Sequence, residues 1–176
     1  RDAILGAQFA LRASIPTWRE FQSTIDWRRE QLTKMQASIA LGHTVSPGDV
    51  SSLGADVVVV GTGARPMKVD LPGMNSSLIQ VMTPHDVVRD GCAQRHVAVV
   101  WDHAGGVIGA GVIESLLLQG LQVHVVTPGF AVAEDLDLIQ RVPFYERVLS
   151  AGARFVPNTD VFAVEADVVK LRNVYT

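Results

Sequence analysis

The chain has 176 residues, of which 48% are hydrophobic and 19% are charged, so it can build an apolar core and is not a disordered chain. Its formal net charge of −3 excludes the basic field that binding to nucleic acid or to an anionic membrane would use. The single cysteine, Cys92, excludes an internal disulfide, a cysteine-rich zinc site and a self-contained iron–sulfur site. The longest apolar runs are far shorter than the roughly 20 residues that span a bilayer, and we expect a cytoplasmic α/β protein.

The first third of the chain predicts one long helix and one buried strand. Apolar residues recur at helical spacing from Thr17 to Gln36. Residues 37–41 predict a short strand, and Ser46–Asp49 has the composition of a turn. The four consecutive valines Val57–Val60, followed by Gly61, are typical of a strand that is buried on both faces of a parallel sheet.

The rest of the chain predicts a crossover, a βαβ unit and an antiparallel hairpin. Residues 67–94 form the crossover, in which Thr83 caps a short helix. From residue 95 onward the expected elements are a strand at 96–102, a helix at 112–119, a strand at 122–126, a helix at 138–150, a strand at 153–156 and a hairpin of 161–164 with 168–171. A strand, a glycine loop, a helix and a second strand in this order define one βαβ unit.

The glycine loop of this unit is the most informative segment. Ala104-x-Gly106-x-x-Gly109 is a degenerate form of the G-x-G-x-x-G pattern, in which glycines permit a tight turn and close approach to a pyrophosphate. We predict that Gly105, Gly106 and Gly109 bind NAD(P) at the N-terminus of the following helix. The alternative is a tight structural turn in a domain that holds no nucleotide. His103, which lies in the same loop, could touch a phosphate.

Two features leave the cofactor undecided. Asp102 and His103 make the connection from strand to loop two residues longer than the usual form. The second strand ends in residues 126–128, Val-Thr-Pro, where an NAD site has an acidic residue and an NADP site has a basic one nearby. The sequence therefore does not distinguish NAD from NADP.

A second glycine cluster, Gly61-Thr62-Gly63, follows the four valines. Small residues at a strand end let the main chain pass close to a bound flavin or ADP. The alternative is a strand end that simply turns into a linker.

Together these motifs resemble the flavoenzymes that carry two dinucleotide-binding domains. Gly6-Ala7-Gln8 is similar to the Gly-Gly-Gln motif of that family, and residues 56–66 are similar to its D-hhhh-A-T-G-x-x-P strand. Residues 99–114, 123–128 and 171–176 resemble the NADH:flavin oxidoreductase branch of trimethylamine dehydrogenase, 2,4-dienoyl-CoA reductase and N-methylproline or dimethylglycine demethylase. The chain departs from the pattern at Ala7, which replaces a glycine, and at Gly61, which replaces an alanine.

The resemblance implies a fragment of a flavin-dependent oxidoreductase that acts on an N-methylated amine or an enoyl-type substrate. It implies FAD or ADP near Gln8, Gly61, Thr62 and Gly63, whereas FMN and a 4Fe-4S cluster would lie in the rest of the parent polypeptide. No catalytic residue and no metal ligand is carried over to this chain. Some members of the family use the inserted domain for a nicotinamide cofactor, and others keep it as structure.

The expected fold is α/β, with a three-layer, Rossmann-like parallel sheet, appended antiparallel strands and an incomplete flavin-domain segment before it. We assign residues 1–66 to a partial FAD- or ADP-binding segment, 67–94 to the crossover linker and 95–176 to an NAD(P)-binding-like domain. The expected partners are a dinucleotide and the rest of the parent polypeptide, and open sheet edges could drive association into a homo-oligomer. The alternative function is a catalytically silent scaffold or subunit-contact domain.

Two further residue groups are assigned ordinary roles. Glu114, on the helix after the glycine loop, is expected to be solvated or to cap the helix. The acidic residues at 134–137 are expected to precede a helix, where negative charge is favourable.

Overall fold

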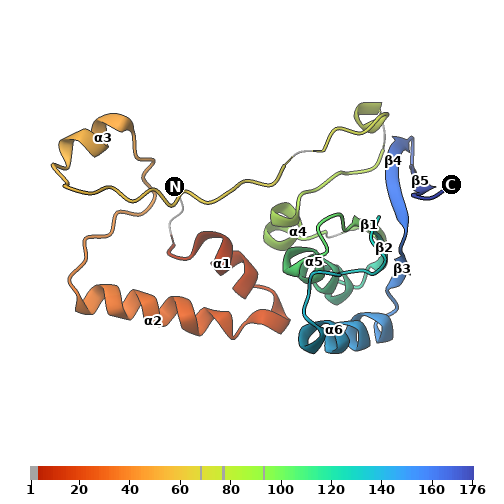
Figure 1. Cartoon of the computed structure of the whole chain (residues 1–176), viewed down its shortest axis with the longest axis horizontal. Helices are drawn as coiled ribbons and strands as arrows, with labels where there is room; N and C mark the ends of the chain where they lie inside the picture. Colours follow the sequence, from red (N-terminus) through yellow and green to blue (C-terminus); the bar gives the residue numbers. More distant parts are fainter. Residues whose placement is uncertain (1–3, 68, 77, 93) are drawn as a thin grey trace. The chain divides into compact units, whose positions relative to one another are not determined.

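The computed structural model describes residues 4–67, 69–76, 78–92 and 94–176. The chain divides into two compact units, which we call unit 1 (residues 1–14 and 18–65) and unit 2 (residues 15–17 and 66–176). Figure 1 labels the helices and strands.

Unit 1 contains α1 (Ala7–Ala13), α2 (Phe21–Lys34) and α3 (Pro47–Ser52), and the short 3-10 helix η1 (Pro16–Trp18) joins the two units. Unit 2 contains η2 (Met74–Ser76), α4 (Pro84–Asp90), β1 (Val97–Trp101), α5 (Val107–Leu118), β2 (Gln122–Val126), α6 (Leu138–Ser150), β3 (Arg154–Val156), β4 (Thr159–Glu165) and β5 (Val168–Asn173).

Unit 2 is built on a parallel sheet in which the strand order is β1-β2-β3. Val97 pairs with Gln122 at the start of the β1–β2 ladder, and His124 pairs with Arg154 at the start of the β2–β3 ladder. The central strand β2 has a neighbour on each side and is mostly buried, whereas β1 has a neighbour on one side and contains only exposed and half-buried residues. The predicted βαβ unit is therefore confirmed.

The core of unit 2 lies between the sheet and its helices. Helix α5 packs against β1 and β2, and α4 and α6 pack against α5 (Figure 1). Ile113 of α5, Val125 of β2 and Phe144 of α6 belong to one cluster of fully buried side chains. The predicted bounds of α6 are confirmed, and Pro143 lies inside this helix without ending it.

The antiparallel hairpin expected near the C-terminus is also confirmed. β4 and β5 pair from Thr159 opposite Asn173 to Glu165 opposite Val168, with an irregularity between Val161 and Ala163. The crossover segment lies against this hairpin, since the Val164 N–H donates to the Pro72 carbonyl over 2.9 Å. The expected α/β fold, with a parallel sheet and appended antiparallel strands, is what the structure shows.

Unit 1 is formed mainly by α1 and α2, with aromatic side chains between them. Phe9 meets Phe21 edge to face, and the rings of Trp18 and Phe21 stack at 5.6 Å. The Arg12 guanidinium lies 4.0 Å from the centre of the Trp18 ring. The helix predicted from residue 17 to residue 36 is confirmed in part, because α2 covers Phe21–Lys34 while η1 and a turn at residues 19–20 precede it.

Two predicted strands of unit 1 are wrong. Val57–Val60 is extended but belongs to no strand, and Val57 and Val59 are 78% and 89% exposed. Residues 37–41 also form no strand, and Ile39 and Leu41 are exposed. The physical reason is the same for both segments, because no strand in the described part of unit 1 offers them a hydrogen-bonding partner.

The predicted turn at Ser46–Asp49 is wrong as well, because this segment starts helix α3. The Ser46 hydroxyl accepts the Asp49 N–H, and the Asp49 carboxylate accepts the Ser46 N–H over 2.7 Å, which is a capping box. Pro47 occupies the first helical position, where its missing N–H costs nothing.

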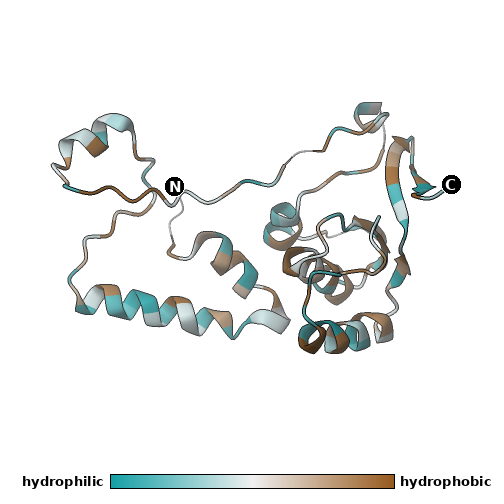
Figure 2. Cartoon of the chain, in the orientation of Figure 1, coloured by the Kyte–Doolittle hydropathy of each residue, from teal (hydrophilic) through white to brown (hydrophobic). Residues whose placement is uncertain are grey.

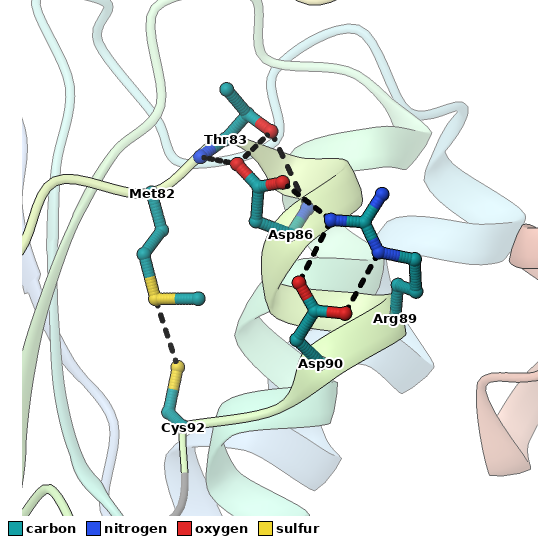
Figure 3. A network of polar contacts seen from close by, with 6 residues as sticks. All are labelled: Met82, Thr83, Asp86, Arg89, Asp90 and Cys92. Atoms are coloured by element: carbon teal, nitrogen blue, oxygen red, sulfur yellow. Dashed lines mark hydrogen bonds and ion pairs between the residues drawn. The ribbon is translucent and has the colours of Figure 1, made fainter.

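Helix α4 begins with the same arrangement, as predicted from Thr83. Figure 3 shows the Asp86 carboxylate accepting hydrogen bonds from the Thr83 hydroxyl over 2.6 Å and from the Thr83 N–H over 3.1 Å. These hydrogen bonds lower the pKa of Asp86 below its ordinary value. Arg89, one turn later, bonds to both Asp86 and Asp90.

Candidate functional site

The glycine loop joins the end of β1 to the start of α5. Gly106 is the N-cap of α5 and has an extended backbone, so the first N–H groups of the helix follow it directly. Gly105 has φ +63°, a left-handed conformation that favours glycine. The loop thus has the strand–loop–helix geometry that a phosphate-binding turn requires.

The three predicted glycines differ in the space around them. A Cβ at Gly109 would lie 2.6 Å from Asp102 Oδ1, and a Cβ at Gly105 would lie 3.2 Å from the Glu134 nitrogen. A Cβ at Gly106 would meet only the Ala104 carbonyl oxygen, at 3.9 Å. Gly105 and Gly109 are therefore required by the protein's own packing, whereas Gly106 leaves room beside it.

The side chain that fills the inside of the loop is Asp102, which directly follows β1. Asp102 is 4% exposed, and its Oδ1 accepts the Gly105 N–H over 3.0 Å. Its Oδ2 accepts the Ala133 N–H over 2.9 Å. This role was not predicted from the sequence, in which Asp102 only lengthens the connection from strand to loop. The signal was present, because a short acid directly after a buried strand is suited to bonding the backbone N–H groups of the next turn.

The segment that follows β2 lies against the glycine loop. The Asp135 N–H donates to the Gly105 carbonyl over 2.9 Å. The Tyr145 hydroxyl of α6 donates to the Val132 carbonyl of the same segment over 2.6 Å. Burial raises the pKa of Tyr145, and the charge of Asp102 adds to the shift while that of Arg141 opposes it. The loop after β2 is thus fixed between Asp102 and α6.

The end of β2 has neither the acid of an NAD site nor the base of an NADP site. Thr127 is buried, and its hydroxyl accepts the Gly129 N–H over 3.2 Å. The acidic residues at 134–137 precede α6, as expected, and the Asp137 carboxylate caps that helix by accepting the Gln140 N–H. The negative charge of these acidic residues is unfavourable for a phosphate group nearby.

Trp101 and His103 lie beside the loop. Their rings meet edge to face with centres 5.7 Å apart, and the Trp101 indole N–H donates to Asp160 Oδ1 over 3.0 Å. The Trp101 ring is half-buried next to the loop, so its fluorescence can report changes there.

The expectation for Glu114 is wrong, because this residue is neither solvated nor a cap. Glu114 is 4% exposed in the middle of α5. Its Oε1 accepts two hydrogen bonds from the Arg147 guanidinium, at 2.6 and 2.9 Å, and its Oε2 accepts the Thr17 hydroxyl over 2.5 Å. Glu114 therefore ties α5 to α6 and to the short segment of residues 15–17 within unit 2.

The residues predicted to contact a flavin or ADP lie in unit 1. The Gln8 amide donates to the Ala64 carbonyl, which places Gln8 beside Gly63. Gly61 and Thr62 lie in exposed, extended chain, and a Cβ at Gly61 would meet nothing within 4 Å. The structure thus brings Gln8 and Gly63 together and leaves Gly61 and Thr62 open. Ala7 has φ +40°, a left-handed conformation at the position where the resembled motif has glycine.

Among the residues that the structure describes, no group of three or more His, Cys, Asp or Glu side chains is arranged to hold a metal ion. In the same part of the chain, no helix is both long and apolar enough to cross a membrane.

The sequence matches the family described as pyridine nucleotide-disulphide oxidoreductase over residues 5–175. A glutathione reductase from Nostoc sp. (strain PCC 7120) is 25% identical over 163 residues, covering 84% of this chain and 34% of that protein. A protein named "Probable N-methylproline demethylase" from Rhizobium meliloti is 24% identical over 160 residues, covering 91% of this chain and 23% of that protein. The chain therefore spans about a third or less of the length of these relatives.

Among solved structures, histamine dehydrogenase from Rhizobium sp. 4-9 is similar over 99% of this chain and 28% of its own, with a TM-score of 0.88. The sequence identity is 21%, so this likeness shows a shared fold.

Proposed function

Because the chain belongs to the pyridine nucleotide-disulphide oxidoreductase family, we propose that it is the dinucleotide-binding part of a flavin-dependent oxidoreductase. The family implies FAD and NAD(P) as its cofactors. In this proposal the parent protein acts on an N-methylated amine or an enoyl-type substrate and belongs to the trimethylamine dehydrogenase-like branch, with FMN and a 4Fe-4S cluster outside this chain. The likeness to the demethylase from Rhizobium meliloti supports that branch.

The observation that carries the proposal is the glycine loop inside a complete βαβ unit. The loop follows β1 and precedes α5, whose N-terminal N–H groups and positive dipole end favour an anion. We assign residues 95–176 to the NAD(P)-binding-like domain, with Gly105, Gly106 and Gly109 as its cofactor-contacting residues. Gly106 is the position at which a ligand can approach, since it has space beside its Cα.

We assign residues 1–66 to the flavin or ADP side and residues 67–94 to the crossover. Gln8 is held beside Gly63 by its hydrogen bond to Ala64, and Gly61 with Thr62 leaves the main chain open to a planar or phosphate-bearing group. When bound, the flavin and the nicotinamide supply the hydride chemistry. The residues of this chain bind and orient these groups, and they contribute no catalytic side chain.

A second candidate function is a catalytically silent scaffold or subunit-contact domain. The observation that favours it is the carboxylate of Asp102, which already bonds the Gly105 N–H inside the loop. Such a domain would keep the fold and hold no nucleotide.

A titration with NADH, NADPH, ADP and FAD distinguishes the two candidates. We expect saturable binding of a nicotinamide cofactor by the full 176-residue chain, read by Trp101 fluorescence and by a shift in melting temperature. Gly106→Val should abolish this binding and leave the fold intact, because Gly106 has an extended backbone and room for a Cβ. The matched control is Gly48→Val in α3, a position that also has room for a Cβ.

Equal affinity of the wild type and Gly106→Val for the cofactor would show that the glycine loop is not the binding site. A cooperative melt without a response to any of the four ligands would contradict cofactor binding by this chain, and the scaffold function would then be favoured.

A further inference from the structure

We propose that Asp102 is an internal anion that occupies the phosphate position of the glycine loop and sets the loop's affinity for phosphate groups. The inference rests on the proposed function in one respect, since it takes this loop as the place where a dinucleotide's pyrophosphate would lie. It makes Asp102 a specificity-determining residue of the loop.

The position of the carboxylate is the first support. A phosphate in such a loop is held by backbone N–H groups of the turn and by the N-terminus of the helix. Asp102 Oδ1 already accepts the N–H of Gly105. It also lies close to Gly109 in the first turn of α5, since a Cβ on Gly109 would be 2.6 Å from Asp102 Oδ1. The carboxylate therefore uses a donor of the turn and the positive end of the helix dipole.

Burial is the second support. Asp102 is 4% exposed, so its charge is poorly screened by solvent and is compensated by the N–H groups that it accepts. A pyrophosphate that entered the loop would bring like charge close to this carboxylate and would compete for the same N–H. The Asp102 carboxylate therefore lowers the loop's affinity for a pyrophosphate.

The loop after β2 is the third support, because Asp102 fixes it in place. Its Oδ2 accepts the Ala133 N–H, and the adjacent main chain at Glu134 and Asp135 lies against Gly105. The Asp135 N–H is itself used by the Gly105 carbonyl. One carboxylate thus joins two loops of unit 2, and a phosphate that takes the Gly105 N–H has to displace it.

The test is a titration of the full chain with inorganic pyrophosphate, followed through the backbone amide signals of Gly105, Gly106 and Val107. We expect pyrophosphate to bind the wild type weakly, so that these signals shift only at high pyrophosphate concentration. In Asp102→Ala the same amides should shift saturably, with an affinity at least about tenfold higher than in the wild type. The matched control is Asp135→Ala, which removes an exposed carboxylate from the neighbouring loop.

Saturable binding by the wild type with the affinity of Asp102→Ala would overturn the proposal, and so would an equal gain in Asp135→Ala. If Asp102→Ala fails to fold, Asp102→Asn replaces it, because it keeps the size of the side chain and removes its charge. A folded Asn variant that binds no better than the wild type would also overturn the proposal. Failure of the proposed function would appear elsewhere, as a chain without affinity for FAD, ADP or a nicotinamide cofactor, since pyrophosphate reports on the loop alone.

Discussion

Two valine-rich segments of this chain have similar composition and opposite surroundings. Val57–Val60 in unit 1 is extended and exposed, whereas Val123, Val125 and Val126 of β2 are 1% exposed or less. β2 lies between β1 and β3, which satisfy its backbone on both sides, and α5 covers it. A run of valines thus favours an extended backbone, whereas its burial depends on neighbours from elsewhere in the chain.

The same contrast extends to the two units. Among the described residues of unit 1, the buried apolar side chains are Ala13 and Ile25, whereas unit 2 has a continuous core that includes Ile113, Val125 and Phe144. Figure 2 shows α2 of unit 1 largely in hydrophilic colours and α5 of unit 2 largely in hydrophobic ones. Since apolar burial is the main favourable term in folding, unit 2 should unfold at a higher denaturant concentration than unit 1.

Gly73→Ala should destabilise unit 2 strongly and so reduce its difference in stability from unit 1. Gly73 has φ +83°, and its Cβ would lie 1.8 Å from the Val164 carbonyl oxygen, so the crossover would separate from β4. We expect a loss of about 3 kcal/mol or more in the free energy of unfolding of unit 2. The measurement is urea unfolding in a variant that keeps only Trp101, which reports on unit 2.

Gly120→Ala is the matched control for this prediction. Gly120 also has φ +83°, but its Cβ would meet nothing within 4 Å. The difference between the two variants therefore isolates the overlap with Val164 from the backbone strain. Equal losses of stability in the two variants would mean that the close approach of Gly73 to the hairpin does not affect the free energy of unfolding.

The ion pair between Arg147 and the buried Glu114 is a feature of unit 2 alone among the residues that the structure describes. Arg147→Ala removes the guanidinium that bonds twice to Glu114, which is 4% exposed. We expect a loss of about 2 kcal/mol in the stability of unit 2, below the value for a fully buried pair because the Arg147 side chain is half exposed. Urea unfolding read from Trp101 measures it.

A double-mutant cycle with Glu114→Gln separates the pair from other effects. We expect the Arg147→Ala loss to shrink when Glu114 is already neutral. Arg89→Ala serves as a control, because Arg89 pairs with Asp86 and Asp90 on the surface and should matter less. A cycle without coupling would show that the ion pair does not stabilise unit 2.

The sequence predicted the elements whose signals are local and complete. Strand β2 and helix α6 were predicted with the bounds that the structure shows, since Gly120 precedes β2, Gly152 follows α6, and the apolar pattern of both segments is clear. Val57–Val60 and residues 37–41 could not be judged in this way, because strand formation needs a partner that local pattern does not reveal. The turn predicted at Ser46–Asp49 is wrong, although this segment has the same capping-box spacing as Thr83–Asp86, for which the sequence predicts a cap.

The candidate site was less predictable than the fold. The glycines of the loop follow from a local motif, but the partners of Asp102 and Glu114 do not. The Asp102–Ala133 hydrogen bond joins residues 31 apart, and the Glu114–Arg147 pair joins residues 33 apart. Such contacts depend on how the loops and helices close on the sheet, so sequence periodicity alone cannot identify them.

Each unit has one capping box among its described residues, and removing either should change the free energy of unfolding only slightly. Thr83→Ala removes the cap of α4, which packs on α5 and buries Val87, and should cost unit 2 about 1 kcal/mol. Ser46→Ala removes the same bonds from α3, which buries no residue. Urea unfolding of unit 1, read from Trp27, should therefore change by less than about 0.5 kcal/mol.

Hydrogen exchange supplies the control, because it detects local fraying that global unfolding misses. Amides of α3 should lose protection in Ser46→Ala, while those of α2 keep theirs. Equal global losses from Ser46→Ala and Thr83→Ala would show that α3 is coupled to the folding of unit 1, contrary to its lack of buried residues. The same capping hydrogen bonds would then contribute equally to the free energy of unfolding in both units. The stability that a helix cap contributes would not depend on whether its helix packs on a core.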